Sequence, residues 1–498
     1  MRRIFSLINT VLAVCALLAA APASAAPGDL DTTFGSGFGM VRTAIGSADG
    51  RSYAIALQPD GKIIVAGYCS NGTNDDFCLV RYLADGALDL SFNSIGKVIS
   101  PIGSTDDRGR TIALQPDGKI VVAGYCWNGS NYDFCLARYL ADGALDTSFG
   151  SGGKIISPIG SGHDYARAIA LQPDGKVVVA GHCGYLPTSY DFCLARYLAN
   201  GTPDTSFGSN GTVISPIGSS EDSGKAIALQ PDGKIVVAGT CVGDSNYDFC
   251  LARYQTDGTL DTSFNSTGKV ISPIGSSIDD ANAIALQPDG KIVVVGACVN
   301  GSTYDFCLAR YQSNGALDAA FGSNGKVISP IGLSNDYGQA LALQPDGKIV
   351  VAGYCDGVSN NDFCLARYQA NGTLDTSFGS SGTVISPIGS SYDWAYAIAL
   401  QPDGKIVVAG ECWNGSNFDF CLARYQGGPF GYRNCTMDLD GDGAVLATTD
   451  ALLLARTSLG MTGSAIINGI SFASHATRTT WPAIREYLVT QCGMTLMP

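Results

Sequence analysis

The chain has 498 residues and carries 30 lysine or arginine side chains against 44 aspartate or glutamate side chains, so its formal net charge at pH 7 is −14. Nucleic acids and anionic membrane surfaces both require a basic face, which argues against a nucleic-acid partner and against electrostatic binding to membranes. Solubility alone is enough to explain the acidic composition.

Residues 1–25 have the features of a bacterial secretory signal peptide. Arg2 and Arg3 form a charged region, residues 8–20 are apolar, and residues 23–25 (Ala-Ser-Ala) form a small-residue cleavage site. We therefore expect a protein that is secreted, periplasmic or at the cell surface. Cleavage removes two arginines and no acid, which takes the formal charge to about −16. No later stretch is apolar and long enough to predict a membrane span.

The chain contains seven copies of one repeat. Each copy has an L/P-D-x-x-F element, a QPDGK element and a DFCLARY segment or close variant, and the cysteines of successive DFCLARY segments are 57 or 58 residues apart. A unit of this length cannot bury its own apolar faces, so neighbouring copies must stack.

Four segments of each copy have the composition of strands. In the second copy they are residues 96–101, 110–115, 119–124 and 133–140, which are rich in β-branched and aromatic residues. The Pro-Asp-Gly turn joins the second and third segments into a hairpin. Several segments are apolar on both faces, which indicates that both faces are covered. The first segment ends in proline in most copies and is therefore assigned to the sheet edge.

The two ends of the repeat region predict how the ring closes. The first copy begins with its outer strand, residues 39–43, and the last copy ends at Tyr425 without one. Residues 39–43 should therefore complete the last blade and leave no open edge. The prediction is an all-β fold, a seven-bladed β-propeller of four-stranded antiparallel blades over residues 29–428.

The repeat unit L-D-x-S-F-G…G-K-V…A-I-A-L-Q-P-D-G-K-I-V-V-A-G…D-F-C-L-A-R-Y resembles the delta-60 repeat, a bacterial β-propeller family. The resemblance implies a propeller scaffold and brings no catalytic residues with it. The cysteine pair in each copy is an addition to the general pattern.

Sixteen cysteines remain after signal cleavage, and an even number in an exported chain indicates disulfides. A metal site would need histidines or tighter cysteine spacing, and the chain has only three histidines. Fourteen cysteines form one local pair per repeat, and two more lie near the C-terminus. The predicted bridges are Cys69 with Cys78, Cys126 with Cys135, Cys183 with Cys193, Cys241 with Cys250, Cys298 with Cys307, Cys355 with Cys364, Cys412 with Cys421, and Cys435 with Cys492.

Each repeat also carries one arginine in DFCLARY and one aspartate in L/P-D-x-x-F. Two interpretations stay open: a buried ion pair that fixes the geometry of each blade, or a solvated surface pair that contributes little. The arginines are Arg81, Arg138, Arg196, Arg253, Arg310, Arg367 and Arg424, and the aspartates are Asp31, Asp89, Asp146, Asp204, Asp261, Asp318 and Asp375.

Variation among the copies concentrates in the loops before residues 110–115 and their equivalents, which should ring one mouth of the central channel. Six of these loops share an aspartate, and the first has Gly50 instead: Asp107, Asp164, Asp222, Asp279, Asp336 and Asp393. The aspartates either cap their loops as Asx turns or belong to a ligand or cation site. In the second case the loops differ in the side chains that they offer to the ligand, which include Tyr165, Tyr337, Trp394 and Arg108.

Trp127 and Trp413 lie in a second variable loop set, either exposed for carbohydrate or protein contact or packed in the loop. No catalytic motif occurs in the sequence. We expect an exported, monomeric, non-catalytic scaffold that binds a protein or carbohydrate partner. The alternative is an extracellular enzyme acting on a polysaccharide or similar substrate at the channel mouth, because propeller loops can assemble sites from distant residues.

Residues 429–498 should form a separate helical module. Asp438, Asp440 and Asp442 alternate before a glycine, as in a calcium loop, with the Ala444 carbonyl as the next ligand. The segment resembles the loop-helix half of a dockerin-type EF-hand, which implies calcium as cofactor and a docking role. Asp450 falls one position beyond the usual last ligand and is either a ligand or a helix N-cap. A second helix should begin at Thr480 and bury Trp481, Ile484, Tyr487 and Leu488.

Overall fold

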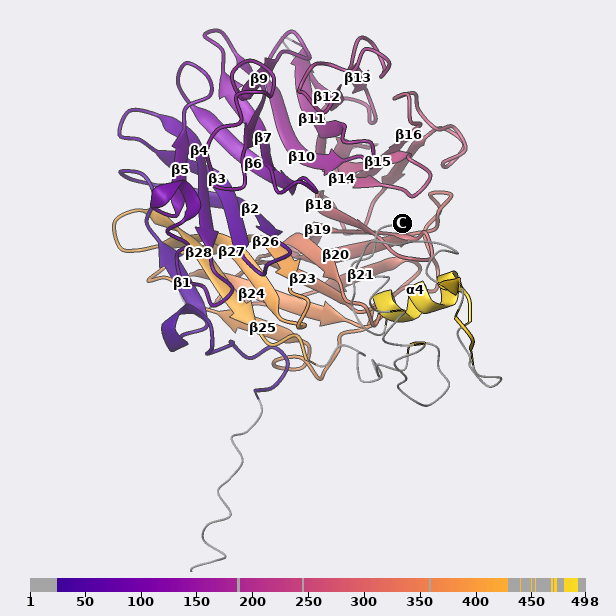
Figure 1. Cartoon of the computed structure of the whole chain (residues 1–498). Helices are drawn as coiled ribbons and strands as arrows, with labels where there is room; N and C mark the ends of the chain where they lie inside the picture. The colour runs from indigo at the N-terminus through magenta and orange to yellow at the C-terminus, as the bar shows by residue number, and fades with distance from the viewer. Residues whose placement is uncertain are drawn as a thin grey trace, which may run out of the picture.

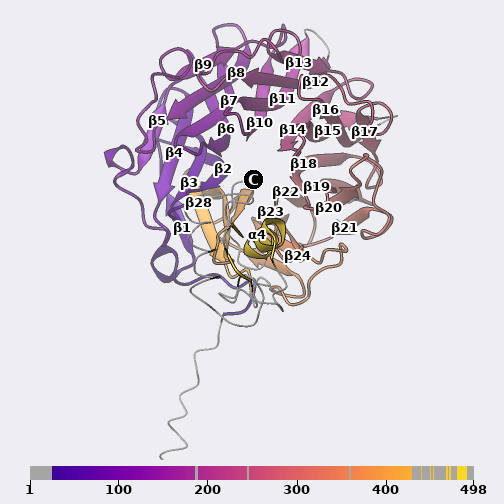
Figure 2. The same cartoon turned by 45° about the vertical axis from the view of Figure 1, so that its right-hand side comes forward.

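The fold is a ring of seven four-stranded antiparallel sheets around a central axis (Figures 1 and 2). The computed structural model describes residues 25–185, 189–243, 246–357 and 360–428 and, in the C-terminal region, Leu439, Thr449, Leu453, Ile467, Asn468 and residues 470–472 and 479–490. The predicted fold class and blade number are confirmed for the propeller.

Each blade runs from an inner strand at the channel to a short outer strand at the rim. The inner strands are β2 (Gly50–Leu57), β6 (Asp107–Leu114), β10 (Asp164–Leu171), β14 (Asp222–Leu229), β18 (Asp279–Leu286), β22 (Asp336–Leu343) and β26 (Asp393–Leu400). The second strands are β3 (Ile63–Ser70), β7 (Ile120–Trp127), β11 (Val177–Tyr185), β15 (Ile235–Val242), β19 (Ile292–Asn300), β23 (Ile349–Asp356) and β27 (Ile406–Trp413).

The third strands are β4 (Asp75–Tyr82), β8 (Tyr132–Tyr139), β12 (Ser189–Tyr197), β16 (Tyr247–Tyr254), β20 (Thr303–Tyr311), β24 (Asn361–Tyr368) and β28 (Phe418–Tyr425). The outer strands are β5 (Lys97–Ser100), β9 (Lys154–Ser157), β13 (Thr212–Ser215), β17 (Lys269–Ser272), β21 (Lys326–Ser329), β25 (Thr383–Ser386) and β1 (Met40–Thr43). We number the blades 1 to 7 by their inner strands. Two short 3-10 helices, η1 (Gly35–Gly37) and η2 (Phe92–Ser94), precede outer strands.

The hydrophobic core lies between the blades. Every residue of β3 except the last is buried, which fits a strand that is covered on both faces. In the cluster between blades 2 and 3, Val121 and Phe134 of one sheet join Val179 and Tyr197 of the next. Apolar burial of this kind ties each sheet to its two neighbours.

The ring is closed by the strand at the beginning of the chain. Strand β1 pairs antiparallel with β28, in the register Met40 opposite Ala423 and Thr43 opposite Phe420, and so completes blade 7. The N–H of Gly28 also donates to the carbonyl of Gln426 at 2.6 Å. The predicted closure is confirmed, and blade 7 has four strands like the other six blades.

All seven predicted disulfides within the repeats are confirmed, and each joins the second and third strands of one blade around their connecting loop. The bonded cysteines have Cα–Cα separations of 5.8 to 5.9 Å and are 9 or 10 residues apart in sequence. From blade 1 to blade 7 the bonds join Cys69 to Cys78, Cys126 to Cys135, Cys183 to Cys193, Cys241 to Cys250, Cys298 to Cys307, Cys355 to Cys364, and Cys412 to Cys421. All fourteen of these cysteines are fully buried, so they are structural and none of them faces the channel mouth as a ligand-binding group. The eighth predicted pair, Cys435 and Cys492, lies outside the described residues.

The repeated arginine and aspartate form a buried ion pair in each blade, which decides between the two interpretations left open by the sequence. Nε of Arg138 is 2.8 Å from Oδ2 of Asp146, and both side chains are less than a tenth exposed. The arginine also lies over the Phe149 ring at 4.4 Å and donates to the Ala199 carbonyl of the next blade at 2.5 Å. In blade 7 the pair is Arg424 with Asp31 from the start of the chain, at 2.7 Å.

In the C-terminal region the structure describes one helix, α4 (Trp481–Thr490), which confirms the second helix predicted there. Trp481, Ile484 and Leu488 are buried with Leu439 and Leu453. The side chain of Tyr487 lies outside the described part. No helix among the described residues is long and apolar enough to cross a membrane.

The predicted helical calcium module is only partly visible. Its calcium-loop residues Asp438, Asp440, Asp442, Ala444 and Asp450 lie outside the described residues, so calcium binding and the dockerin resemblance stay predictions.

Candidate functional site

The six aspartates that begin inner strands are buried inside their own loops. Each is at most 1% exposed. Asp107 accepts hydrogen bonds from the backbone N–H groups of Ile102, at 2.6 Å, and Gly103, at 2.9 Å. Asp164, Asp222, Asp279, Asp336 and Asp393 bind the equivalent amides of their loops. These hydrogen bonds support the loop-capping interpretation, in which the aspartate fixes the start of the inner strand.

Burial changes the acidity of these capping groups. It raises the pKa of five of them to about 6, although the amide hydrogen bonds to each carboxylate act in the opposite direction. These five are Asp107, Asp164, Asp279, Asp336 and Asp393. The folded protein therefore binds protons to these carboxyls more tightly than the unfolded chain does.

This difference predicts a protein that is most stable in mild acid. Because the folded pKa of these five carboxyls exceeds the ordinary value of 3.8, their contribution to stability is complete below that value and is lost as pH rises through about 6. Asp89, Asp204 and Asp261 of the ion pairs have pKa values lowered to about 2, since hydrogen bonds and the paired arginine outweigh burial, so stability also falls below 3.8. The melting temperature should therefore drop by several degrees between pH 4.5 and 7.5, as followed by circular dichroism.

A matched pair of variants separates this effect from general repulsion among acids. Asp164→Asn should flatten the dependence of melting temperature on pH. Asp142→Asn should leave this dependence unchanged, because Asp142 lies in an exposed turn. Asparagine is compatible with the turn, since Asn200 occupies the equivalent position of the next repeat. An identical slope in both variants and the wild type would contradict the assignment.

The residue after each capping aspartate, or after Gly50 in blade 1, is half-buried at the channel mouth, and five different residue types occur there. We call these seven positions the mouth ring: Arg51, Arg108, Tyr165, Ser223, Asp280, Tyr337 and Trp394. The ring contains Tyr165, Tyr337, Trp394 and Arg108, which the sequence had pointed to. Arg51, Ser223 and Asp280 were missed as members, because nothing in the sequence indicated that the residue after the aspartate faces the mouth.

Aromatic side chains gather at two parts of this mouth. Tyr165 contacts Tyr125 and His182, with ring centroids 4.8 and 5.2 Å apart. Tyr337 stacks between Tyr304, at 5.1 Å, and Tyr354, at 4.9 Å.

Trp394 extends the second group. It stacks on Phe418 at 5.1 Å and donates from Nε1 to Asn361 at 3.2 Å. The loop residues Trp127 and Trp413 are half-buried and contact Tyr132 and Phe418 edge-on, which favours the packed interpretation for both.

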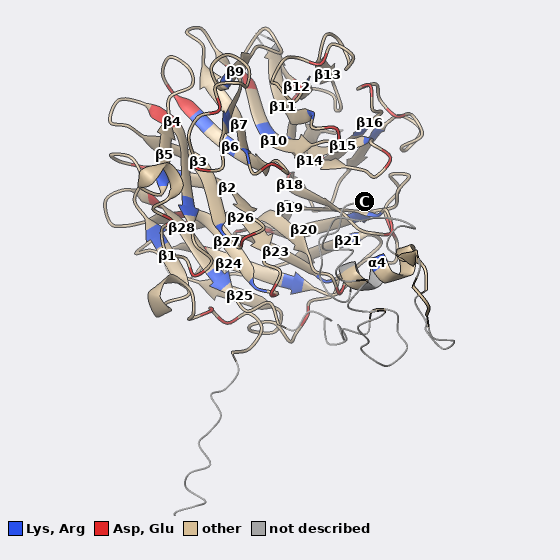
Figure 3. Cartoon of the chain, viewed as in Figure 1, with Lys and Arg blue, Asp and Glu red and all other residues tan. Residues whose placement is uncertain are grey.

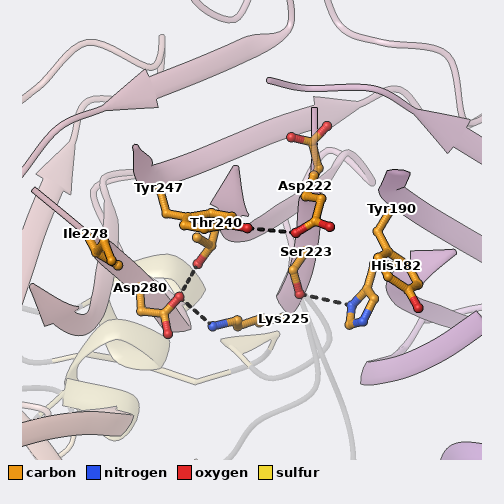
Figure 4. A pocket seen from close by; sticks show the side chains of 10 residues that line it. His182, Tyr190, Asp222, Ser223, Lys225, Thr240, Tyr247, Ile278 and Asp280 are labelled. Atoms are coloured by element: carbon orange, nitrogen blue, oxygen red, sulfur yellow. Dashed lines mark hydrogen bonds and ion pairs between the residues drawn. The ribbon is translucent and has the colours of Figure 1, made fainter. Parts of the chain in front are cut away.

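A pocket of about 390 Å³ opens between blades 3, 4 and 5 (Figure 4). On one side Asp280 binds Nζ of Lys225 at 3.0 Å and the hydroxyl of Thr240 at 2.9 Å. On the other side Oγ of Ser223 is 3.0 Å from Nδ1 of His182. Tyr247 and Glu221 form the outer wall, with the tyrosine hydroxyl donating to the carboxylate at 2.7 Å.

The pocket favours binding over proton transfer. Burial, followed by the charges of Arg167 and Lys225, lowers the pKa of His182 to about 3, so the imidazole is neutral and a weak base beside Ser223. The carboxylates of Glu221, Asp222 and Asp280 are each held by a hydrogen bond or ion pair. The polar groups that line the pocket can hydrogen-bond a ligand.

A second ring of side chains lines the channel below the mouth. Every inner strand has a register shift that leaves one residue without a partner in the second strand, as at Arg167 between Ala166 and Ala168. The seven residues at this position, which we call the channel ring, enclose a cavity of about 300 Å³: Tyr53, Arg110, Arg167, Lys225, Asn282, Gln339 and Tyr396. The sequence signal for this ring was a large polar residue at one fixed position inside an otherwise small and apolar strand.

One buried acid lies beside these rings. Glu411 on β27 is fully buried, pairs with Arg51 at 3.1 Å, and has its second carboxylate oxygen without a hydrogen-bond partner. Burial raises the pKa of Glu411 to about 7, although the charge of Arg51 opposes the change. Other blades have tyrosine, histidine, threonine or alanine at this position.

Within the described part of the chain, no three or more histidine, cysteine, aspartate or glutamate side chains are grouped as a metal site would require.

The blades and the channel define a seven-bladed β-propeller. Seven segments of its repeats match the family described as "Domain of unknown function (DUF5122) beta-propeller", at residues 58–92, 115–149, 172–207, 230–264, 287–321, 344–378 and 401–427. The match confirms the delta-60-like repeat that the sequence indicated. Among curated proteins, none matches this chain.

Solved structures resemble this chain at low identity. An inactive virginiamycin B lyase from Staphylococcus aureus with quinupristin is 11% identical over 77% of this chain and 98% of that chain, with a TM-score of 0.43. An ulvan lyase is 11% identical over 78% of this chain and 96% of that chain, with a TM-score of 0.44. Drosophila Plexin A with Semaphorin 1b is 9% identical over 80% and 89%, with a TM-score of 0.43. The likeness is one of fold alone.

Proposed function

We propose that the protein is an exported, non-catalytic propeller that binds a carbohydrate at the channel mouth. One observation carries the proposal: the mouth ring differs in all but one of its neighbouring pairs, while the strands and ion pairs that build each blade repeat almost unchanged. Tryptophan, aspartate and serine all occur at this position, so the fold of a blade does not require any particular one of them. The variation therefore serves something that contacts several blades at once.

The chemistry of the mouth suits a sugar polymer. The aromatic rings of Tyr337 and Trp394 offer apolar faces with polar edges. The pocket between blades 3 and 5 offers hydroxyl, carboxylate and ammonium groups within one cavity of about 390 Å³. Clefts that combine apolar faces with a few fixed polar groups are the usual form of ligand sites. Seven disulfides fit the oxidising compartment in which such polymers occur.

The proposal predicts that glycan binding depends on the aromatic side chains of the mouth ring. A glycan array screened with the full chain should identify a ligand, and Trp394→Ser and Tyr337→Ser should each weaken its binding about tenfold or more, because truncating a central aromatic contact commonly costs over 1 kcal/mol. Serine is a safe replacement, since Ser223 already occupies the same position in blade 4. Isothermal titration calorimetry measures the effect.

The matched control is Phe38→Ser, which removes an aromatic side chain that is 69% exposed and lies outside the mouth ring. Its binding should equal that of the wild type. Equal loss in all three variants, or no glycan ligand in the screen, would remove the carbohydrate proposal.

A second candidate function is an enzyme acting on a polysaccharide at the same mouth. The observation that favours it is Glu411, whose pKa of about 7 suits proton transfer near neutral pH. Incubation of the bound polymer with the wild type would then release soluble oligosaccharides, and Glu411→Gln would stop their release. Binding without release supports the non-catalytic proposal.

A further inference from the structure

We propose that the channel ring contains an anion site, in which Arg110 and Arg167 bind an oxyanion such as a sulfate, phosphate or carboxylate group. This site lies deeper than the mouth ring and is independent of the carbohydrate proposal. It rests on the charge of the ring, on the missing partners of its arginines and on the cavity that they face.

The channel ring concentrates positive charge in an acidic protein. Its three basic residues, Arg110, Arg167 and Lys225, occupy the same position in the consecutive blades 2, 3 and 4, and no ring position is acidic. Figure 3 shows the basic residues of β6 and β10 in blue. The net charge of the chain is −14, so a basic composition does not account for this arrangement.

The nearby acids form their ion pairs with basic residues other than Arg110 and Arg167. Asp280 binds Lys225 at 3.0 Å, and Lys225 also donates to Asn282 at 3.2 Å. Glu411 pairs with Arg51 at 3.1 Å. Two guanidinium groups of the ring therefore have no carboxylate of their own among the described residues.

Arg110 and Arg167 differ from the other buried arginines of this chain. In Arg138, Nε binds Asp146, and the two terminal nitrogens bind the Ala199 carbonyl and Ser148. By contrast, Arg110 makes one hydrogen bond, to the Tyr125 hydroxyl at 2.9 Å, and its Nε is buried without a partner.

Arg167 has even fewer polar contacts. Its contacts in the described part of the chain are with the rings of Tyr125 and Tyr165, at 5.7 and 5.8 Å. Burial and then the charge of Arg110 lower the pKa of Arg167 to about 10. Both side chains therefore stay charged at neutral pH, close enough to repel each other, and a bound anion would relieve that repulsion.

The cavity and the donors fit an oxyanion. The ring encloses about 300 Å³, which is several times the share of one water molecule, about 30 Å³. The guanidinium group is planar and presents paired N–H donors that match two oxygens of a sulfate, phosphate or carboxylate. The Arg110 guanidinium lies over the ring of Tyr53 at 4.0 Å, and Tyr53 and the adjacent Tyr396 also line the cavity.

The test is calorimetric titration of the full chain with sodium sulfate at constant ionic strength. Saturable binding with one sulfate per chain is expected. The double variant that combines Arg110→Gln and Arg167→Gln should bind at least tenfold more weakly, because it removes both guanidinium groups that donate charge-assisted hydrogen bonds to the anion. Glutamine is compatible with the fold, since Gln339 occupies the same ring position in blade 6.

Two controls locate the site. Arg42→Gln removes a half-exposed basic side chain of β1, outside the channel ring, and should bind sulfate like the wild type. Trp394→Ser changes the mouth and should also leave sulfate binding unchanged, so failure of the mouth proposal and failure of the channel proposal give different results.

A further titration identifies the source of the anion by replacing sulfate with polygalacturonate, and neutral dextran serves as the uncharged comparison. Binding of sulfate indicates a site for a free ion. Binding of polygalacturonate alone, lost in the double arginine variant, indicates the acidic group of a polymer. No binding of either, or equal binding by the double variant and the wild type, would overturn the proposal.

Discussion

Deletion of residues 26–43 is expected to abolish the cooperative folding of the propeller. The deletion removes β1, which is the outer strand of blade 7, and also Asp31, which is the partner of Arg424. Breaking a buried ion pair by removing one partner costs about 3–5 kcal/mol, and β28 is left as an unpaired edge that can recruit other chains. We expect loss of the sharp thermal transition and aggregation, which circular dichroism and size-exclusion chromatography would detect.

A circular permutant that keeps residues 27–427 provides a control in which β1 is retained. In other blades a four-residue turn follows the third strand, and its last N–H bonds back to its first carbonyl, as Gly143 does to Leu140 at 2.9 Å. In blade 7 the N–H of Gly28 bonds to the carbonyl of Gln426 in the same way. Gly427 and Pro27 therefore occupy the two middle positions of this turn, although they are not joined in the chain. Joining Gly427 directly to Pro27, with new ends between Thr43 and Ala44, should therefore preserve the fold. Equal loss of folding in the deletion and the permutant would contradict the closure argument.

Reduction of the seven disulfides should lower the melting temperature more than any single substitution. Each bridge closes a loop of about ten residues, for which the chain-entropy model gives about 2–3 kcal/mol of stabilisation. All seven lie in equivalent places, so their loss destabilises every blade at once. We expect the reduced and alkylated protein to unfold at a temperature tens of degrees lower, or to fail to fold at 25 °C.

Removal of one bridge is the matched comparison. The double variant of Cys241→Ala and Cys250→Ala deletes the bond of blade 4 alone and should lower stability by about 2–3 kcal/mol, as measured by urea denaturation. An unchanged melting temperature in protein whose cysteines are shown by mass spectrometry to be fully alkylated would refute a stabilising role for the bridges.

The architecture was predictable because its evidence is repeated and local. The cysteines of each pair lie 9 or 10 residues apart, and the missing outer strand after Tyr425 pointed to its replacement by β1. The arginine and aspartate recur in every blade, but their burial depends on the loop of the next blade, as with Ala199 over Arg138. The sequence could therefore pose the two interpretations of this pair without deciding between them.

The site was predictable only in part, because it depends on register and on contacts between blades. Tyr165, Tyr337 and Trp394 do lie at the mouth, as expected. A large polar residue recurs at the position of Arg167 in every inner strand, but the register shift beside it and the cavity that these residues share appear only in the structure. The capping aspartates were equally ambiguous, since a shared carboxylate in a loop suits either a ligand or backbone amides.

Because β1 pairs with β28, the propeller can fold completely only when the whole repeat region is present. Arg424 and Asp31 are 393 residues apart in sequence, so the earliest part of the propeller has no partner until the last repeat has been made. A chain that stops short of β28, through early termination or proteolysis, leaves β1 and one blade edge exposed together. Unpaired strand edges readily pair with other chains, so an incomplete molecule is expected to aggregate.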